Sequence, residues 1–120
     1  MNATSLMKRR KDMPQEPLNA CHGGVGSVQW VGVISHQDLA GKRLRFVHDD
    51  VLPPGTSIGV HPHHDDEEYY YILEGCGMMT LDSERFEVRP GDIAAVFPGG
   101  EHGLENNSDA DLRLIVISVS

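Results

Sequence analysis

The sequence predicts an all-β fold, either a barrel or a sandwich. Short apolar stretches recur along the chain, and clusters of Gly, Pro, Asn and Asp separate them at regular intervals. No window of about 12 residues keeps the apolar spacing of three and four that an amphipathic helix needs. At 120 residues and 13.2 kDa, the chain has the size of one domain.

Nine strands are expected after residue 24, and the stretch 35–41 is expected to be a turn or a short helical piece. The stretch 42–51 alternates apolar and charged residues, which is the period of a half-buried strand. The apolar run 69–73 indicates a central strand covered on both faces. The last stretch also alternates, which indicates a C-terminus held in a sheet. The expected strands are 25–34, 42–51, 56–63, 69–73, 77–81, 85–88, 93–97, 102–105 and 112–119.

Residues 1–24 are predicted to form an irregular arm, and residues 25–120 a single domain. Pro14, Pro17 and the pair Gly23 and Gly24 would interrupt any regular element in the arm. The basic run 8–11 can mark a targeting or nucleic-acid patch, but a solvated terminal tail is the more common role. No apolar segment follows the run, so it does not have the pattern of a secretory signal.

Charge and cysteine content exclude several classes of partner and setting. The formal net charge is −8, so nucleic acid and anionic membranes are not expected as partners because both would be repelled. No apolar run approaches the roughly 20 residues of a membrane-spanning helix. The chain has two cysteines, Cys21 and Cys76, which favours a reducing, cytoplasmic setting over a disulfide scaffold. Whether the two cysteines pair is left open.

Three histidines and one glutamate form a candidate metal site. His61 and His63 are two residues apart, so on a strand their side chains project from the same face. An acidic loop then leads to Glu68, and His102 opens a later strand. If they converge, the three imidazoles and the carboxylate would hold one divalent transition metal ion: Mn, Fe, Ni, Cu or Zn. The alternatives are an ordinary surface or core histidine pair and a closed tetrahedral zinc site.

The spacing around these residues resembles the two sequence motifs of the cupin superfamily. In the second motif the proline position holds Phe97, and Pro98 comes one residue later. The other positions match without gaps, over about half of the chain. The matching residues are Gly55, His61, His63, Glu68 and Gly75 in the first motif and Gly91, Gly99, His102 and Asn106 in the second.

This resemblance implies an antiparallel double-stranded β-helix, also called a jelly-roll barrel, and usually a homodimer. Glu67 also satisfies the variable spacing of the first motif, but the six residues that lead to Gly75 favour Glu68 as the ligand. Asn106 would form hydrogen bonds in a turn and would not bind metal. The metal ligands implied by the family are His61, His63, Glu68 and His102.

Further side chains are candidates by their position on the predicted strands. If Glu68 points inward, Tyr70 and Ile72 do as well. Tyr70 is therefore the candidate catalytic residue, as a proton donor, and the alternative is a lining residue with a satisfied hydroxyl. The remaining candidates are His48 in the core or lining the barrel, Arg45 at the surface or facing a substrate carboxylate, His22 in a lid over the barrel mouth, and Asp65 and Asp66 in a solvated acidic turn.

The resemblance leaves two classes of function open. The first is a metal-dependent enzyme, such as an oxygenase, decarboxylase, isomerase or lyase, that acts on a small oxygen-rich molecule. Sugar acids, carboxylates and catechol-like compounds fit that description. The second is a module that binds or senses a small molecule or a metal without turnover. The fold does not choose between them.

Overall fold

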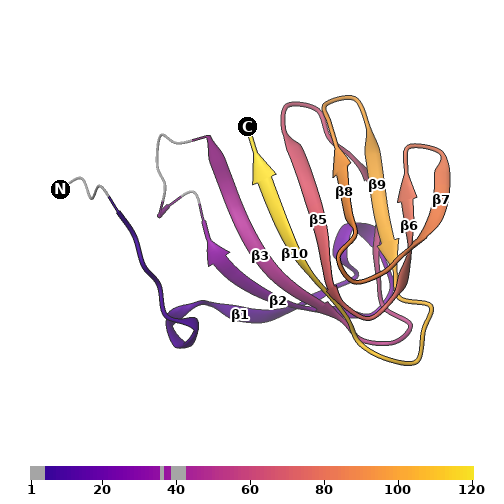
Figure 1. Ribbon diagram of the computed structural model, residues 1–120, viewed down its shortest axis with the longest axis horizontal. Coiled ribbons are helices and arrows are strands. Elements are labelled where there is room, and N and C mark those ends of the chain that lie inside the picture. The colour runs from indigo at the N-terminus through magenta and orange to yellow at the C-terminus, as the bar shows by residue number, and fades with distance from the viewer. Residues whose placement is uncertain (1–4, 36, 39–42) are drawn as a thin grey trace.

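The computed structural model describes residues 5–35, 37–38 and 43–120, and it confirms the all-β, double-stranded β-helix prediction. The described strands form two antiparallel sheets rather than one closed barrel (Figure 1). The six-stranded sheet has the order β1-β2-β3-β10-β5-β8, and the four-stranded sheet has the order β4-β9-β6-β7. The strands are β1 (Gln15–Asn19), β2 (Ser27–Ile34), β3 (Leu44–Leu52), β4 (Ser57–Pro62), β5 (Glu67–Glu74), β6 (Gly77–Leu81), β7 (Glu84–Val88), β8 (Ile93–Val96), β9 (Glu101–Glu105) and β10 (Leu112–Val119).

Each of the nine predicted strands is present, with ends within two residues of the prediction. The turn clusters are strong signals because Gly and Pro end a strand for backbone reasons that tertiary contacts rarely override. Strand β5 begins earlier than predicted because Glu68 pairs with Ser118 of β10 and with Val96 of β8. Most of the predicted turn at 35–41, namely residues 36 and 39–41, lies outside the described residues.

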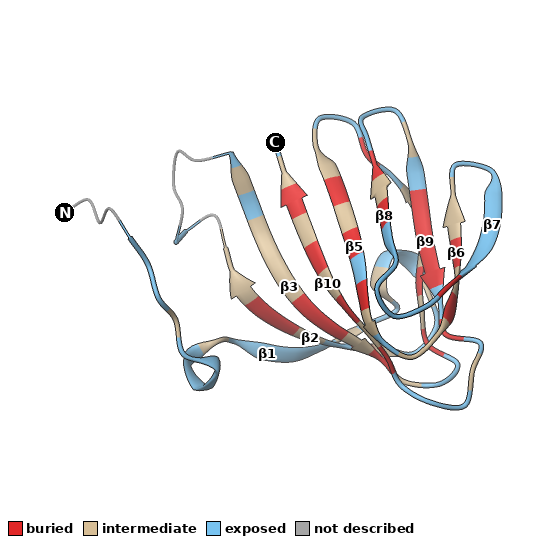
Figure 2. Cartoon of the chain, viewed as in Figure 1, coloured by how far each residue is buried: buried red, intermediate tan, exposed pale blue. Residues whose placement is uncertain are grey.

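The inner faces of the two sheets enclose the core. Along β10 the residues Leu112, Leu114, Val116 and Ser118 are buried, and the residues between them are half-buried, as the alternating bands in Figure 2 show. The same alternation runs along β5, but Tyr71 is 40% exposed, so the prediction that both faces of this strand are covered is wrong. The core cluster comprises Val28, Leu52, Ile58, Tyr70, Ile72, Met79, Val88, Ala94, Leu104, Leu112, Leu114 and Val116.

The N-terminal arm is more regular than its sequence predicts. Strand β1 pairs with β2 at the edge of the six-stranded sheet, and Pro17 lies opposite Gln29 in this pair. An edge strand has one side without a sheet partner, so a residue that lacks the N–H is tolerated there. The basic run is also attached, since Lys8 and Arg10 form ion pairs with Asp38 and Asp49. The arm therefore lies against the domain that it precedes.

The short 3₁₀ turn η2 (Cys21–Gly23) contacts strand β4. Gly59 of β4 makes this approach possible, because a side chain there would collide with the carbonyl group of His22. Gly24 meets the backbone of Ser57 in the same way. Among the described helices, none is long and apolar enough to cross a membrane.

Candidate metal centre

Four side chains converge between the two sheets, and they are the four that the sequence singled out. One ligand atom from each of His61, His63, Glu68 and His102 lies within 4.8 Å of all the others. The Nε2 atom of His102 lies 3.0 Å from Nε2 of His63 and 3.1 Å from Nε2 of His61. It also lies 3.2 Å from Oε1 of Glu68. This donor set fits a first-row transition metal.

Strand register brings these residues together. His61 and His102 face each other across the β4–β9 pair of the four-stranded sheet. His63 directly follows β4, and its backbone N–H donates to the carbonyl of Gly100, just before β9. Glu68 enters from β5 of the six-stranded sheet, on the same face as Tyr70 and Ile72. The cluster therefore spans both layers of the fold.

The His61 ring is arranged to present the lone pair of its Nε2 atom at the centre. Nδ1 of His61 lies 2.8 Å from the carbonyl oxygen of Gly59, which can only accept, so the proton of this ring resides on Nδ1. Burial lowers the pKa of His61 to about 4. Burial alone would raise the pKa of Glu68, but the hydrogen bond to His102 and the neighbouring histidine charges outweigh it and lower that pKa. Neutral imidazoles and an ionised carboxylate are the forms that bind metal.

A second carboxylate orients His63. Oδ1 of Asp66 lies 3.1 Å from Nδ1 of His63, and Oδ2 accepts a hydrogen bond of 3.1 Å from Ser118. The guanidinium of Arg45 lies 2.8 Å from the same Oδ2. The prediction of a solvated turn is therefore wrong for Asp66. Arg45 is exposed, as its predicted surface position implies, and it pairs with a protein carboxylate rather than facing a substrate. A hollow of about 440 Å³ outside this network reaches one member of the cluster, His63.

The lid expected from His22 has a structural counterpart. The His22 ring stacks on His61, with centroids 3.6 Å apart and an interplanar angle of 11°. The turn η2 carries this ring across the half-buried side of His61, and the glycine contacts with β4 hold the turn in place. The N-terminal segment therefore covers one side of the cluster.

Tyr70 lies beside the cluster and inside the core. Its side chain is 2% exposed, and its ring lies 4.4 Å from the ring of His102. Burial raises the pKa of Tyr70 well above its ordinary value, and the charges of Glu68, Asp50 and Cys21 raise it further. The phenol is therefore neutral, and it can donate a hydrogen bond.

The other named residues have defined places. Asn106 is fully buried and donates to the carbonyl groups of Leu52 and Ala110, each at 2.7 Å, which agrees with the predicted turn role. His48 is half-buried and stacks on Phe46 at 4.1 Å, and burial lowers its pKa to about 4. His64 is exposed.

Sequence reasoning missed one interior group, Asp50. Its side chain is 4% exposed, and it lies on the inner face of β3 between His48 and Leu52. The signal was present, because period two places Asp50 on the face of Phe46 and His48. Consecutive aspartates such as Asp49 and Asp50 are usually interpreted as solvated, so the burial of Asp50 was not predicted.

Comparisons with known proteins agree with this geometry. The chain is 28% identical to an oxalate-binding protein from Thermotoga maritima over 116 residues, which are 97% of this chain and 95% of that one. It superposes with a TM-score of 0.88, at 27% identity, on the crystal structure of a predicted oxalate decarboxylase from the same organism, and the match covers 95% of this chain and 98% of the other. It is also 35% identical to quercetin 2,3-dioxygenase from Escherichia coli over 60 residues, 48% of this chain and 26% of that enzyme.

The family comparison covers both motifs and most of the strands. A family model described as "Cupin domain" matches residues 49–118. This range begins in β3 and ends in β10, and it includes all four residues of the buried cluster. The chain belongs to the cupin family.

Proposed function

We propose that this protein binds one divalent transition metal ion through His61, His63, Glu68 and His102, and that the metal site acts on a small carboxylate. The single observation that carries the proposal is the buried cluster, whose ligand atoms lie within 4.8 Å of one another. Three imidazoles and one carboxylate leave coordination positions for a water or a substrate, as in catalytic rather than structural sites. Mn, Fe, Ni, Cu and Zn are all compatible with this donor set.

Oxalate is the first ligand to test. The Thermotoga maritima matches, which cover nearly the whole chain, are described as an oxalate-binding protein in the sequence comparison and as a predicted oxalate decarboxylase in the structure comparison. A bound divalent ion polarises a substrate oxygen and offsets negative charge. The chain's own residues would do the rest: Asp66 orients His63, His22 covers His61, and the neutral Tyr70 phenol donates a proton beside His102.

A second candidate function is binding without turnover. The description of the Thermotoga maritima relative as a binding protein favours it. Oxalate incubated with metal-loaded protein separates the two, because an enzyme consumes oxalate and a binding protein returns it intact. Catechol-like and sugar-acid substrates belong in the same assay, since the match to quercetin 2,3-dioxygenase covers 48% of this chain.

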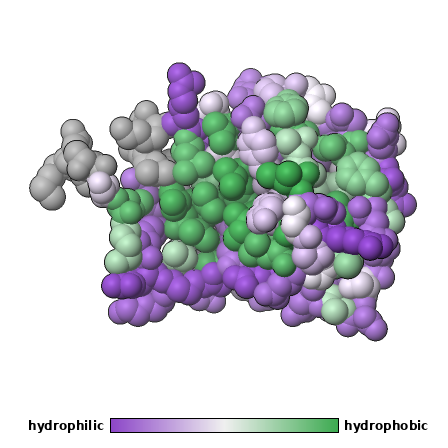
Figure 3. Space-filling view, in the orientation of Figure 1, coloured by the Kyte–Doolittle hydropathy of each residue, from purple (hydrophilic) through white to green (hydrophobic). Residues whose placement is uncertain are grey.

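We also propose a homodimer, formed over the outer face of the six-stranded sheet. Hydrophobic residues gather over β2, β3 and β10 in Figure 3. Val47, Val51, Ile115 and Ile117 alternate with inward residues on β3 and β10 and remain half-buried. Sedimentation should give twice 13.2 kDa, and Ile117→Glu should give a monomer, whereas Val60→Glu on the other sheet should not.

That this protein resides in a reducing, cytoplasmic compartment stays a prediction from its cysteine content.

Elemental analysis tests the metal site. Protein without a tag, purified without chelator, should contain about one equivalent of a transition metal, and His61→Ala should lose it. His64→Ala is the matched control, because His64 is exposed and lies outside the cluster. Wild-type protein that takes up none of the five ions would overturn the proposal.

A further inference from the structure

The loop that joins β1 to β2 reaches from one sheet to the other. It comprises residues 20–26, and a backbone hydrogen bond of 3.0 Å between its first and last residues closes its base. Both flanking strands belong to the six-stranded sheet, but Val25 contacts Ser57 of β4, at the edge of the four-stranded sheet. The carbonyl of Val25 accepts from the Ser57 N–H at 2.8 Å, and its N–H donates to Ser57 Oγ at 2.9 Å. The loop therefore bridges the two layers beside the strand that carries His61.

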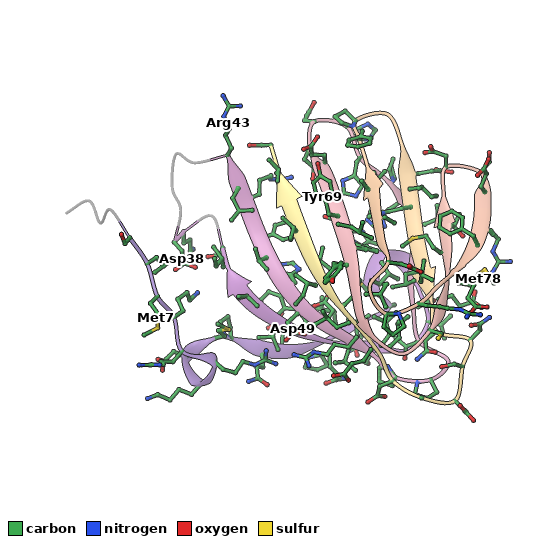
Figure 4. All side chains as sticks on the ribbon, viewed as in Figure 1. Met7, Asp38, Arg43, Asp49, Tyr69 and Met78 are labelled. Carbon is green, nitrogen blue, oxygen red and sulfur yellow. The ribbon has the colours of Figure 1, made fainter. Side chains whose placement is uncertain are left out.

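The segment before this loop is fixed to the domain. Lys8 pairs with Asp38 at 2.9 Å and Arg10 pairs with Asp49 at 2.5 Å, and both aspartates are labelled in Figure 4. Strand β1 then pairs with β2 along its whole length. The loop is therefore presented by an anchored hairpin and not by a free terminus.

The loop holds its place in an unfavourable backbone conformation. Ala20 and His22 both have φ of 50°, in the left-handed region where residues other than Gly are uncommon. Such a conformation persists only where the surrounding structure imposes it, and residues of this kind cluster at functional sites. The packing against β4 imposes it here, because a side chain on Gly59 would collide with the carbonyl of His22, and one on Gly24 would collide with the carbonyl of Ser57. The position of His22 is therefore imposed by the fold.

This conformation lays the His22 ring flat on the ring of a proposed metal ligand. The centroids of His22 and His61 are 3.6 Å apart, and the ring planes differ by 11°. The backbone of Gly59 serves both rings, since its carbonyl lies 2.8 Å from Nδ1 of His61 and its missing side chain admits the loop. His22 is itself exposed, so packing in the core does not explain where it lies.

The stack restrains the orientation of His61. An imidazole holds a metal ion only while its lone pair points at the ion, and the second side-chain torsion of histidine is otherwise broad. The hydrogen bond to Gly59 fixes one edge of the ring, and the His22 ring lies against its face. Aromatic pairs typically contribute about 2- to 12-fold to an equilibrium constant.

We propose that His22 is a positioning residue of the metal site, whose ring holds His61 in the orientation that binds the ion and so slows release of the ion. This inference rests on the proposed function. His22 lies outside residues 49–118, which match the cupin model, so the contribution comes from the N-terminal segment and not from the two family motifs.

Release of Zn²⁺ from the loaded protein into an excess of a chromophoric chelator measures this role. His22→Ala should release the ion about 3- to 10-fold faster than wild type, because the stacked ring is lost. His22→Asn should do the same, since Asn tolerates a positive φ but cannot stack. His22→Phe keeps a flat ring and should restore release to within about twofold of wild type. Ala20→Gly is the matched control, because it relieves the other positive φ without removing the ring, and it should release the ion like wild type.

Two measurements on the metal-free protein complete the test. Proton NMR of wild type should show a nuclear Overhauser effect between the rings of His22 and His61, because they lie in contact. Urea unfolding of His22→Ala should keep a midpoint close to that of wild type, because the His22 side chain is exposed. An absent Overhauser effect would contradict the stack.

The outcomes separate the two proposals. If His22→Ala releases Zn²⁺ as slowly as wild type, or His22→Phe releases it as fast as His22→Ala, the positioning role is wrong while the metal site stands. A large fall in the urea midpoint of His22→Ala would likewise show that the ring holds the fold and not the ligand. If wild type takes up neither zinc nor another of the proposed ions, the proposed function is overturned, and the positioning role with it.

Discussion

Removal of the Asp66 carboxylate should weaken metal binding far more than it weakens folding. Asp66 accepts from His63 and Ser118 and pairs with Arg45, so it fixes both the ring orientation of His63 and the position of its Nδ1 proton. Loss of such a partner typically costs 10- to 100-fold in metal affinity. The Asp66 side chain is only 13% exposed and held at both oxygens, so we expect the upper half of this range, about 2–3 kcal/mol for Asp66→Ala.

The effect on stability should be smaller. Arg45 is 46% exposed and returns to water when its partner is removed, and an ion pair of this kind contributes at most about 1 kcal/mol. Asp66→Asn keeps an acceptor for His63 and loses only the charge, so its affinity should fall about tenfold or less. Asp65→Ala removes the neighbouring exposed carboxylate and should change nothing.

Competition with a chromophoric chelator for Co²⁺ or Zn²⁺ gives the affinities, and urea unfolding of the metal-free proteins gives the stabilities. The reasoning is refuted if Asp66→Ala and Asp65→Ala bind the ion equally well. It is also refuted if the loss of affinity in Asp66→Ala is matched by an equal loss of metal-free stability, since the carboxylate would then hold the fold and not the ligand.

Three further predictions concern the interior. The raised pKa of Asp50 means that the folded state binds its proton more tightly than the unfolded chain. The free energy of unfolding of wild type should therefore fall as pH rises from about 4 to about 8, by up to about 1.4 kcal/mol per pH unit. Asp50→Asn should lack this fall. Urea unfolding at pH 5, 7 and 9 tests this, and the same pH dependence in wild type and Asp50→Asn would contradict it. Tyr70→Phe should keep its metal and lower oxalate turnover about a hundredfold, and unchanged turnover would exclude Tyr70 as the proton donor. Gly59→Ala should cost about 1–3 kcal/mol in urea unfolding, because the added methyl group meets the carbonyl of His22, and a variant as stable as wild type would show that η2 moves freely.

The strands, and the direction in which the cluster residues face along each strand, were predictable because they rest on local rules. Turn clusters end strands wherever they occur. The two-residue period of a strand puts His61 on the same face as His63, and Glu68 on the same face as Tyr70. The convergence of these strands came from the family resemblance, since no local rule brings β4, β5 and β9 to one point. Register within the four-stranded sheet explains one part of it, because His61 lies opposite His102.

The features that were missed depend on contacts between distant segments. Strand β1 contains Pro17 and charged residues, and only its edge position beside β2 makes it a strand. Asp66 resembles any acidic turn residue until Arg45 and Ser118 are placed beside it. Asp49 and Asp50 are both 4% exposed, and their partners distinguish them: Asp49 pairs with Arg10 and Arg113, whereas Oδ1 of Asp50 has no hydrogen-bond partner among the described residues. Sequence spacing carries none of these three facts.

The residues of the proposed metal site come from both sheets, and this affects how long the folded protein would persist. Glu68 belongs to one sheet, and His61 and His102 belong to the other, so an ion held by all of them would clamp the two layers together. By linkage, an ion present at 100 times its dissociation constant adds about 2.7 kcal/mol to the free energy of unfolding. Metal supply would then govern how often the two layers separate and a protease gains access, so starvation for the ion would lower the amount of folded protein.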